Sequence, residues 1–426
     1  MKAFQASPPG EGRLQSIDAL RGIAALGVVF YHAAWQSSSA VPANIFRWPV
    51  KLLQFVSSFG YIGVFLFFII SGFCIHLQWA KARANQQPQS IQFGAFWRRR
   101  FRRLYPPYLI AFALFMLMAA LTTGINLTHF FVYDVVAHLL MLHNLDPHTC
   151  YSINGVFWTL AIEEQLYLAY FLLLFLRKRW GWGPTLIICI GARVGWFTLS
   201  HVAWLATGFG VPVPEAAASH WFTWALGAIA VEAAFGLVKL PRWCWNLWLG
   251  AAAIVAASAT SMFLPYLQKD SPAHDLAWLL VHPVWGIGFF ILVNRAVQIE
   301  QTWSKQRQRG EVVRRLNIKR IVRRLVAATA FVGVFSYSLY LTHELVIMQS
   351  WWFVSNRLPQ QLNMLLIVVP ATIGVAWLFY LFCEKPYMRK AVVNKVQRSD
   401  VGDRTNEIKE QRPEIRSPLV YTTSDI

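Results

Sequence analysis

Charged residues are scarce in this chain of 426 residues, since Lys, Arg, Asp and Glu make up only 14% of it. An average soluble domain has about a quarter. Hydrophobic residues make up 56%. A water-soluble protein of this length needs far more charge to cover its surface, and intrinsic disorder requires low hydrophobicity. The composition therefore excludes both classes for most of the chain and indicates a protein that crosses a membrane many times.

Cysteine and acidic residues are also few. No two of the five cysteines have the spacing of a metal site or a redox pair, so we expect no bound metal and no disulfide framework. The 20 acidic residues face 39 Lys and Arg, which gives a net charge of +19. A basic excess can indicate nucleic-acid binding, but here the basic clusters separate apolar stretches, as in proteins oriented in a membrane. We therefore expect a lipid bilayer and no nucleic acid as partner.

Long apolar stretches dominate the rest of the sequence. A helix needs about 20 apolar residues to cross the hydrocarbon of a bilayer. The predicted fold class is therefore all-α, a polytopic membrane protein with about ten transmembrane helices. A shorter apolar stretch, 129–143, is expected to be an interfacial or re-entrant helix. The predicted spans lie near 20–37, 59–79, 104–123, 156–176, 184–206, 220–238, 244–265, 276–294, 326–349 and 362–383.

The distribution of basic residues predicts the orientation. The loop 80–103 holds seven Lys and Arg with no acid, and the loop 295–325 holds ten. With ten spans, both loops lie on one side, which is cytoplasmic by the positive-inside rule, so both termini are predicted to be cytoplasmic. We expect a cytoplasmic N-terminal segment (1–16), an integral-membrane domain (17–390) and a disordered cytoplasmic tail (391–426).

Ionisable side chains inside a span are costly, so each of them is a functional candidate. Arg21 and His32 are eleven residues apart and share one face of the first helix, about 16 Å apart along its axis. A phosphate-bearing ligand held by Arg21 at the cytoplasmic mouth could extend its reactive end toward His32. The alternative is a snorkelling arginine and a histidine whose hydrogen bonds are satisfied by a neighbouring helix.

A pair of carboxylates enters the fourth helix from the opposite side. Glu163 lies about 10 Å into that helix, at a depth similar to that of His32. A carboxylate beside an imidazole fixes its tautomer and raises its basicity, as in hydrolase triads, so the two could form a pair. Glu164 points about 100° away and cannot face the same site. The alternatives are neutralisation of Glu163 by Arg193, or its protonation through burial.

Three further segments carry polar side chains. Ser71 stands next to Gly72 in the second helix, where close packing is favoured over a nucleophilic role. The five arginines of 98–103 fit a topology signal and anionic-lipid contact, or a phosphate clamp. The ninth helix carries polar residues along its length, namely Ser336, Tyr337, Tyr340, His343 and Glu344.

Together these segments resemble the integral-membrane acyltransferase 3 family, which includes bacterial polysaccharide O-acetyltransferases. The similarity is ordered and runs from residue 14 to about 386. IDALRGIAALGVVFYH resembles the first-helix signature, an Arg followed by ten residues and a His, and FFIISGF resembles the second. RRRFRRLYPPY, FWTLAIEEQLY and FSYSLYLTHE resemble three more. Thr159 and Thr342 depart from the usual Ser and Trp. The matching positions include Arg21, His32, Arg100, Arg103, Trp158, Glu163, Ser336, Tyr337, Tyr340 and His343.

The resemblance implies an acyl-CoA co-substrate, usually acetyl-CoA, delivered from the cytoplasm, with no permanently bound cofactor. It implies an acceptor hydroxyl on a sugar or glycan, often lipid-linked, and a multi-pass protein of the cell membrane, the inner membrane of a bacterium. We expect Arg21, Arg100 and Arg103 to hold the phosphates of CoA. His32 would act as general base on the acceptor hydroxyl, and Glu163 would orient or assist it.

Other functions stay open at this stage. A transporter could use the buried histidine and carboxylate to relay protons, but the absence of an internal repeat counts against it. A non-catalytic partner in polysaccharide assembly, or an acyltransferase for a non-glycan small molecule, also fits. The sequence leaves the acceptor, the acyl chain and the oligomeric state open.

Overall fold

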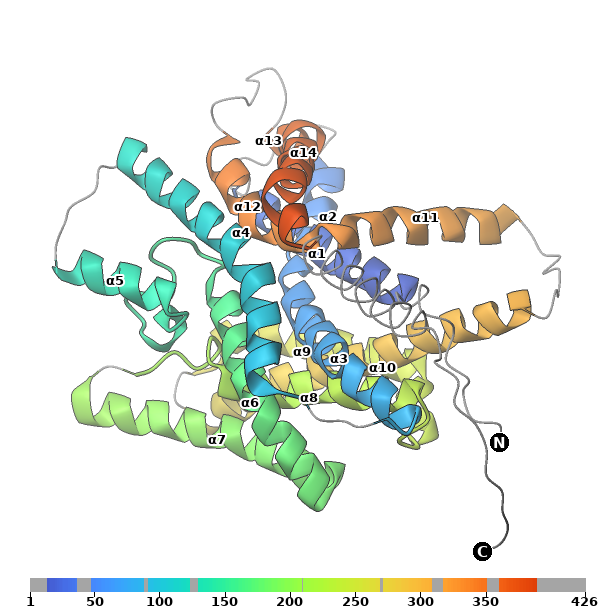
Figure 1. The fold of residues 1–426 in the computed structure, drawn as a ribbon. Coiled ribbons are helices and arrows are strands. Elements are labelled where there is room, and N and C mark those ends of the chain that lie inside the picture. Colours follow the sequence, from blue (N-terminus) through green and yellow to red (C-terminus); the bar gives the residue numbers. More distant parts are fainter. Residues whose placement is uncertain are drawn as a thin grey trace, which may run out of the picture.

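The computed structural model describes residues 14–36, 47–87, 91–122, 129–208, 210–268, 271–308, 317–350 and 360–388. These residues form helices and loops with no strand among them, which confirms the all-α prediction (Figure 1). The predicted tail 391–426 lies outside the described residues, and so does all but the end of the predicted N-terminal segment 1–16.

The described helices follow one another along the chain. They are α1 (Gln15–Gln36), α2 (Arg47–Ser57), α3 (Gly63–Ala84), α4 (Phe93–Thr122), α5 (His129–Leu139), α6 (Trp158–Trp180), α7 (Trp182–Thr207), α8 (Ala217–Ala234), α9 (Leu247–Phe263), α10 (Pro272–Gln308), α11 (Asn317–Val334), α12 (Ser336–Met348), α13 (Gln360–Asn363) and α14 (Val369–Phe379). A π-helical turn, Met364–Val368, joins the last two. The predicted re-entrant stretch 129–143 begins with α5, a short apolar helix, and continues beyond Leu139 as a loop.

Eight helices of the described residues are long and apolar enough to cross a membrane. A ninth is added if α11 and α12, which meet at an angle of 75°, form one broken span. These match nine of the ten predicted segments. The tenth, 220–238, coincides with α8, which is long enough but is not among these helices because polar residues such as Ser219, His220 and Glu232 lower its hydropathy. Of its 18 residues, 14 are buried. The even number of spans, and with it the orientation of the termini, stays a prediction.

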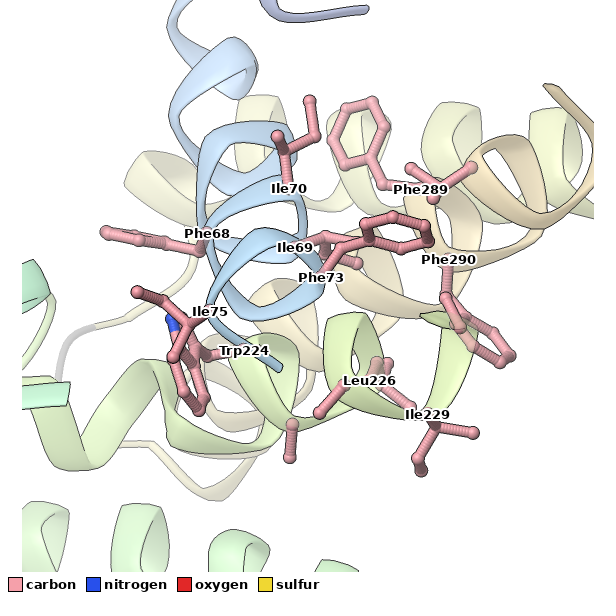
Figure 2. Packing of buried hydrophobic residues seen from close by; sticks show 14 of the residues in the cluster. Phe68, Ile69, Ile70, Phe73, Ile75, Trp224, Leu226, Ile229, Phe289 and Phe290 are labelled. Atoms are coloured by element: carbon pink, nitrogen blue, oxygen red, sulfur yellow. The ribbon is translucent and has the colours of Figure 1, made fainter. Parts of the chain in front are cut away.

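The largest hydrophobic cluster of the described residues lies where α3, α8 and α10 pack together (Figure 2). Two glycines allow α3 and α8 to come into backbone contact. A Cβ atom on Gly72 would lie 2.0 Å from the carbonyl oxygen of Trp224, and one on Gly227 would lie 2.0 Å from that of Ile69. Small residues of this kind let membrane helices approach closely, so the two glycines fix the separation of the central pair.

The same device places α1 against α11 (Figure 1). A Cβ atom on Gly22 would lie 1.9 Å from the carbonyl oxygen of Thr329, and one on Gly333 would lie 1.9 Å from that of Asp18. Gly333 stands just before the bend at Phe335, after which α12 leaves the direction of α11 by 75° and contacts α1. The contact therefore brings the polar residues of α12 beside those of α1.

A buried ionic cluster ties α3, α6 and α8 together. Arg177 donates two hydrogen bonds of 2.6 Å to the carboxylate of Glu232, which also contacts Nε2 of His76 at 2.8 Å and accepts a bond from Trp182. The guanidinium of Arg177 lies 4.7 Å from the ring centre of Trp79. Every charged group in the cluster has a partner, as a buried charge requires, so the cluster is structural.

The loop between α5 and α6 is fixed by two stacked imidazoles. The rings of His138 and His143 lie 3.9 Å apart and nearly parallel, and both are fully buried. Burial, reinforced by the neighbouring His138, lowers the pKa of His143 to about 3. Its ring is therefore neutral at physiological pH and can stack without charge repulsion. This loop continues through Gly155 to the start of α6, next to the site described below.

Candidate active site

A pocket with about 470 Å³ of empty space lies between α1, α3, α6 and α12. Its apolar wall is formed by Val64, Phe67 and Phe68 of α3 and by Leu160 of α6. Its polar lining includes Thr159 and five of the residues that the sequence singled out, which are Arg21, Glu163, Ser336, Tyr337 and Tyr340. Ser336 and Tyr337 reach it because α12 begins directly after the bend at Phe335.

Two more of the predicted arginines gather near this pocket. Arg100 and Arg103 are one turn apart on α4 and half-buried, whereas Arg98, Arg99 and Arg102 are exposed. The charges of Arg21, Arg100 and the Glu384 carboxylate act on the guanidinium of Arg103. Its Nε atom is buried and finds no hydrogen-bond partner among the described residues. An N–H donor left in this state beside two further guanidinium groups is suited to an anion.

Glu163 belongs to this cationic region. Its carboxylate accepts a hydrogen bond of 3.0 Å from Tyr167 and another from Ser71, and the charges of Arg21 and Arg100 act on it. Ser71 in turn accepts a bond of 3.3 Å from the indole of Trp224. Ser71 therefore links α8 to the carboxylate.

His32 lies at the other end of the site, about three turns along α1 from Arg21. Its Nδ1 atom lies 2.9 Å from the carbonyl oxygen of Val28 and 3.3 Å from Nε2 of His343. Because a carbonyl can only accept, Nδ1 carries the proton, and Nε2 is the basic nitrogen of the neutral ring. That Nε2 atom lies 3.4 Å from Oε1 of Glu344.

His343 is held by its own helix. Its Nδ1 atom lies 2.8 Å from the carbonyl oxygen of Tyr340, so Nδ1 carries the proton and Nε2 is left as an acceptor. The Nδ1–H group of His32 can donate to that acceptor. The two rings lie 4.9 Å apart. His343 and the carbonyl of Val28 therefore select the same tautomer of His32.

The structure does not pair His32 with Glu163 as the sequence analysis expected. Among the described residues, the carboxylate that contacts His32 is Glu344. Equal depth in the bilayer is a statement about position along a helix, and it does not fix the direction in which a side chain points. Glu344 could have been found in the sequence as an ionisable residue inside a predicted span, next to His343. Arg193, the proposed neutralising partner of Glu163, instead binds the carbonyl oxygens of Leu279, Trp278 and Ser219.

Tyr340 connects the pocket to the histidine pair. It lines the pocket, and its ring lies 5.6 Å from that of His343. Its hydroxyl accepts a hydrogen bond of 2.6 Å from Thr159 and donates one of 3.1 Å to the carbonyl oxygen of Val156. Tyr340 and His343 therefore link the pocket to His32, which is not among the residues that line the pocket.

The other predicted residues lie around this site. Tyr337 donates to the carbonyl oxygen of Leu104 at 2.8 Å and Ser336 to that of Gly333 at 3.1 Å, so both hydroxyls are engaged with the backbone. Trp158 is half-buried against the α3–α8 cluster and is not among the residues that line the pocket. The described part of the chain has no group of three His, Cys, Asp or Glu side chains placed to hold a metal ion.

Comparison with known proteins finds acyltransferases among the relatives of this chain. The family model described as an acyltransferase domain matches residues 14–382. A peptidoglycan O-acetyltransferase, OatA of Listeria monocytogenes, is 30% identical over 209 residues, which are 44% of this chain and 29% of the relative. Nodulation protein 10 of Rhizobium leguminosarum is 28% identical over 45% of this chain and 52% of its own length.

A longer match covers most of both chains. Acyltransferase MdmB of Streptomyces mycarofaciens is 26% identical over 350 residues, which are 80% of each protein. The chain thus spans less than two thirds of the first two relatives and most of the third. No solved structure matches it.

Proposed function

The chain belongs to the acyltransferase family whose domain matches residues 14–382, and from this premise we propose that it transfers an acyl group from acyl-CoA to a hydroxyl of a sugar or glycan at a membrane. The observation that carries the proposal is the arrangement of the site. Arg21 and Tyr340 line the pocket, and the charges of two more arginines act near it. The ring of Tyr340 contacts His343, which contacts His32, whose Nε2 atom is available as a base.

The arginine end is suited to the donor. Coenzyme A carries phosphates, and the guanidinium group matches phosphate geometry with paired donors. With the phosphates on Arg21, Arg100 and Arg103, the pantetheine arm runs along the apolar wall formed by Phe67 and Phe68. The thioester then lies toward His32, about 16 Å from Arg21 along α1. In the proposed orientation the donor enters from the cytoplasm.

The chemistry is a direct acyl transfer. Nε2 of His32 takes the proton of the acceptor hydroxyl as its oxygen attacks the thioester carbon. The bond from carbon to sulfur then breaks, and the leaving thiolate takes the proton back from Nε2. The products are the ester and free CoA. Positioned proton transfer of this kind contributes about 10²–10⁴-fold to the rate.

The acceptor end carries exposed aromatic rings. Tyr31 contacts His32 edge to face, and the ring of Trp35 lies 6.5 Å from that of Tyr31 with 71% of the residue exposed. Flat apolar faces beside the base can stack a sugar ring. The relative named as a peptidoglycan O-acetyltransferase has a glycan acceptor, in keeping with this class.

One observation favours a second candidate. The broken helix α11–α12 places polar residues at a bend of 75°, and transporters build substrate sites at interrupted helices. Incubation of membranes with radiolabelled acetyl-CoA separates the two functions. An acetylated product that depends on the protein is expected, and uptake of a solute with no labelled product would reject the transferase.

Neutralising the buried arginine should weaken donor use. Arg103→Ala is expected to raise the KM for acyl-CoA by about tenfold or more, because one phosphate loses a charge-assisted bond worth roughly 1.5–3 kcal/mol. The kcat should change less. Arg102→Ala is the matched control, since Arg102 lies next to it on α4 and is exposed. Equal KM values for the two variants in steady-state assays would reject the role of Arg103.

A further inference from the structure

We propose that Glu344 is the positioning residue of His32, which holds the imidazole and stabilises the positive charge that forms on it during acyl transfer. This inference rests on the proposed function and deepens it. It gives Glu344 the part that the sequence analysis gave to Glu163.

One oxygen of the Glu344 carboxylate is held by a backbone hydrogen bond, and the other faces His32. Oε1 of Glu344 lies 3.4 Å from Nε2 of His32, and Oε2 accepts a hydrogen bond of 3.1 Å from the backbone N–H of Gly155. The two side chains are 13% and 22% exposed respectively, so the pair is partly buried. A carboxylate tied to the backbone of another element keeps its orientation when His32 changes its protonation state.

Two adjacent residues of α12 act on opposite nitrogens of the same ring. His343 and the carbonyl of Val28 engage Nδ1, while Glu344 faces Nε2. The distance of 3.4 Å from Nε2 to Oε1 exceeds that of a formed hydrogen bond, so the lone pair of Nε2 is still available to an acceptor hydroxyl. Once Nε2 holds the proton, the imidazolium and the carboxylate form an ion pair.

This arrangement stabilises the transition state more than the ground state. Among the described residues, His32 is the one basic side chain within 4 Å of the Glu344 carboxylate. Arg21 and Arg100 act instead on Glu163. The negative charge of Glu344 therefore gains a cationic neighbour only when His32 is protonated, and an interaction that forms only then raises kcat. The proton passes from the hydroxyl to Nε2 and on to sulfur, and Glu344 does not exchange it.

Gly155 provides an independent test of the same contact. A Cβ atom there would lie 3.2 Å from Oε1 and 3.4 Å from Oε2 of Glu344, which is closer than most carbon contacts. The backbone of Gly155 lies outside the left-handed region, so alanine can adopt its conformation. Alanine at this position would press on the carboxylate and displace it without a change of charge.

The first experiment removes the negative charge of Glu344 and keeps the shape of its side chain. Glu344→Gln should lower kcat by about 10- to 100-fold, with the KM for acetyl-CoA unchanged. This loss is smaller than that expected from removal of the base itself, because His32 is still present. Glu344→Asp should restore part of the loss because it restores the charge. Glu215→Gln is the control, since Glu215 is a similarly buried carboxylate that binds Tyr151 away from His32. A wild-type kcat for Glu344→Gln overturns the proposal.

The second experiment moves the carboxylate. Gly155→Ala should lower kcat several-fold, whereas Gly183→Ala, at a helical position with nothing within 4 Å of its Cβ, should not. An unchanged kcat for Gly155→Ala contradicts the proposed support of Glu344. The outcomes distinguish the role of Glu344 from the proposed function. A wild-type protein that transfers no acetyl group rejects the acyltransferase function. An active wild type with an equally active Glu344→Gln variant rejects only the role of Glu344.

Discussion

His32→Ala is expected to abolish acyl transfer, with a fall in kcat of about 10²–10⁴-fold. The variant removes the nitrogen that takes the proton of the acceptor hydroxyl, and no other basic group contacts the same point among the described residues. His343 cannot replace it, because its Nδ1 atom is committed to the carbonyl oxygen of Tyr340 and its Nε2 atom faces Nδ1 of His32. The donor should still bind, since Arg21, Arg100 and Arg103 are unchanged.

The measurement is transfer of labelled acetyl groups by purified protein, together with the thermal unfolding temperature in detergent. His201→Ala is the control, because His201 is an exposed histidine on α7. Both variants should unfold near the wild-type temperature. Full acetylation of the acceptor by His32→Ala would reject the assignment of His32 as the base.

Much of the fold could be predicted from hydropathy alone. Helices that face lipid on one side must be apolar along their length, so α4, α7, α9 and α14 stand out in the sequence. The sequence predicts a helix at the position of α8. It does not show that other helices surround α8, because burial depends on residues far away in the sequence. The bend at Phe335 could not be predicted either, since the stretch 326–349 reads as one continuous apolar segment.

That bend explains which part of the site the sequence missed. Spacing along α1 predicts one side of the helix for Arg21 and His32, and Arg100 and Arg103 lie one turn apart on α4. The partner of His32 depended on how α12 leaves α11. The change of direction by 75° brings Glu344 to Nε2 of His32, while Glu163 stays among the arginines. Distances along single helices cannot give this relation between helices.

Glu163 lies near the arginines and Glu344 lies near His32, which indicates separate roles for these two carboxylates. Glu163 balances positive charge next to the pocket, where Arg21 and Arg100 act on it. Among the described residues, the basic side chain in contact with Glu344 is His32. In the proposed reaction the donor brings its phosphates to the end with Glu163, and the acceptor brings its hydroxyl to the end with Glu344.

Of the substitutions proposed for this protein, Gly227→Val is expected to lower the free energy of unfolding most, so that little folded protein is recovered from membranes. A Cβ atom at this position would lie 2.0 Å from the carbonyl oxygen of Ile69 and 2.8 Å from the amide nitrogen of Phe73, and both are backbone atoms that no rotamer change can move. The helices α3 and α8 would have to separate, which opens the central cluster shown in Figure 2. Overpacking in a core costs about 1–3 kcal/mol and sometimes more.

Gly191→Val isolates this effect from helix propensity. Both glycines are helical and lose the same flexibility, but a Cβ atom on Gly191 meets nothing within 4 Å. The free energy of unfolding in detergent should therefore fall for Gly227→Val and stay near the wild-type value for Gly191→Val. If the two variants unfold alike, the close approach of α3 and α8 is not what holds the centre of the molecule. Because α3 forms most of the apolar wall of the pocket, Gly227→Val should also bind acyl-CoA more weakly. This loss should appear under conditions in which the variant still has wild-type helix content.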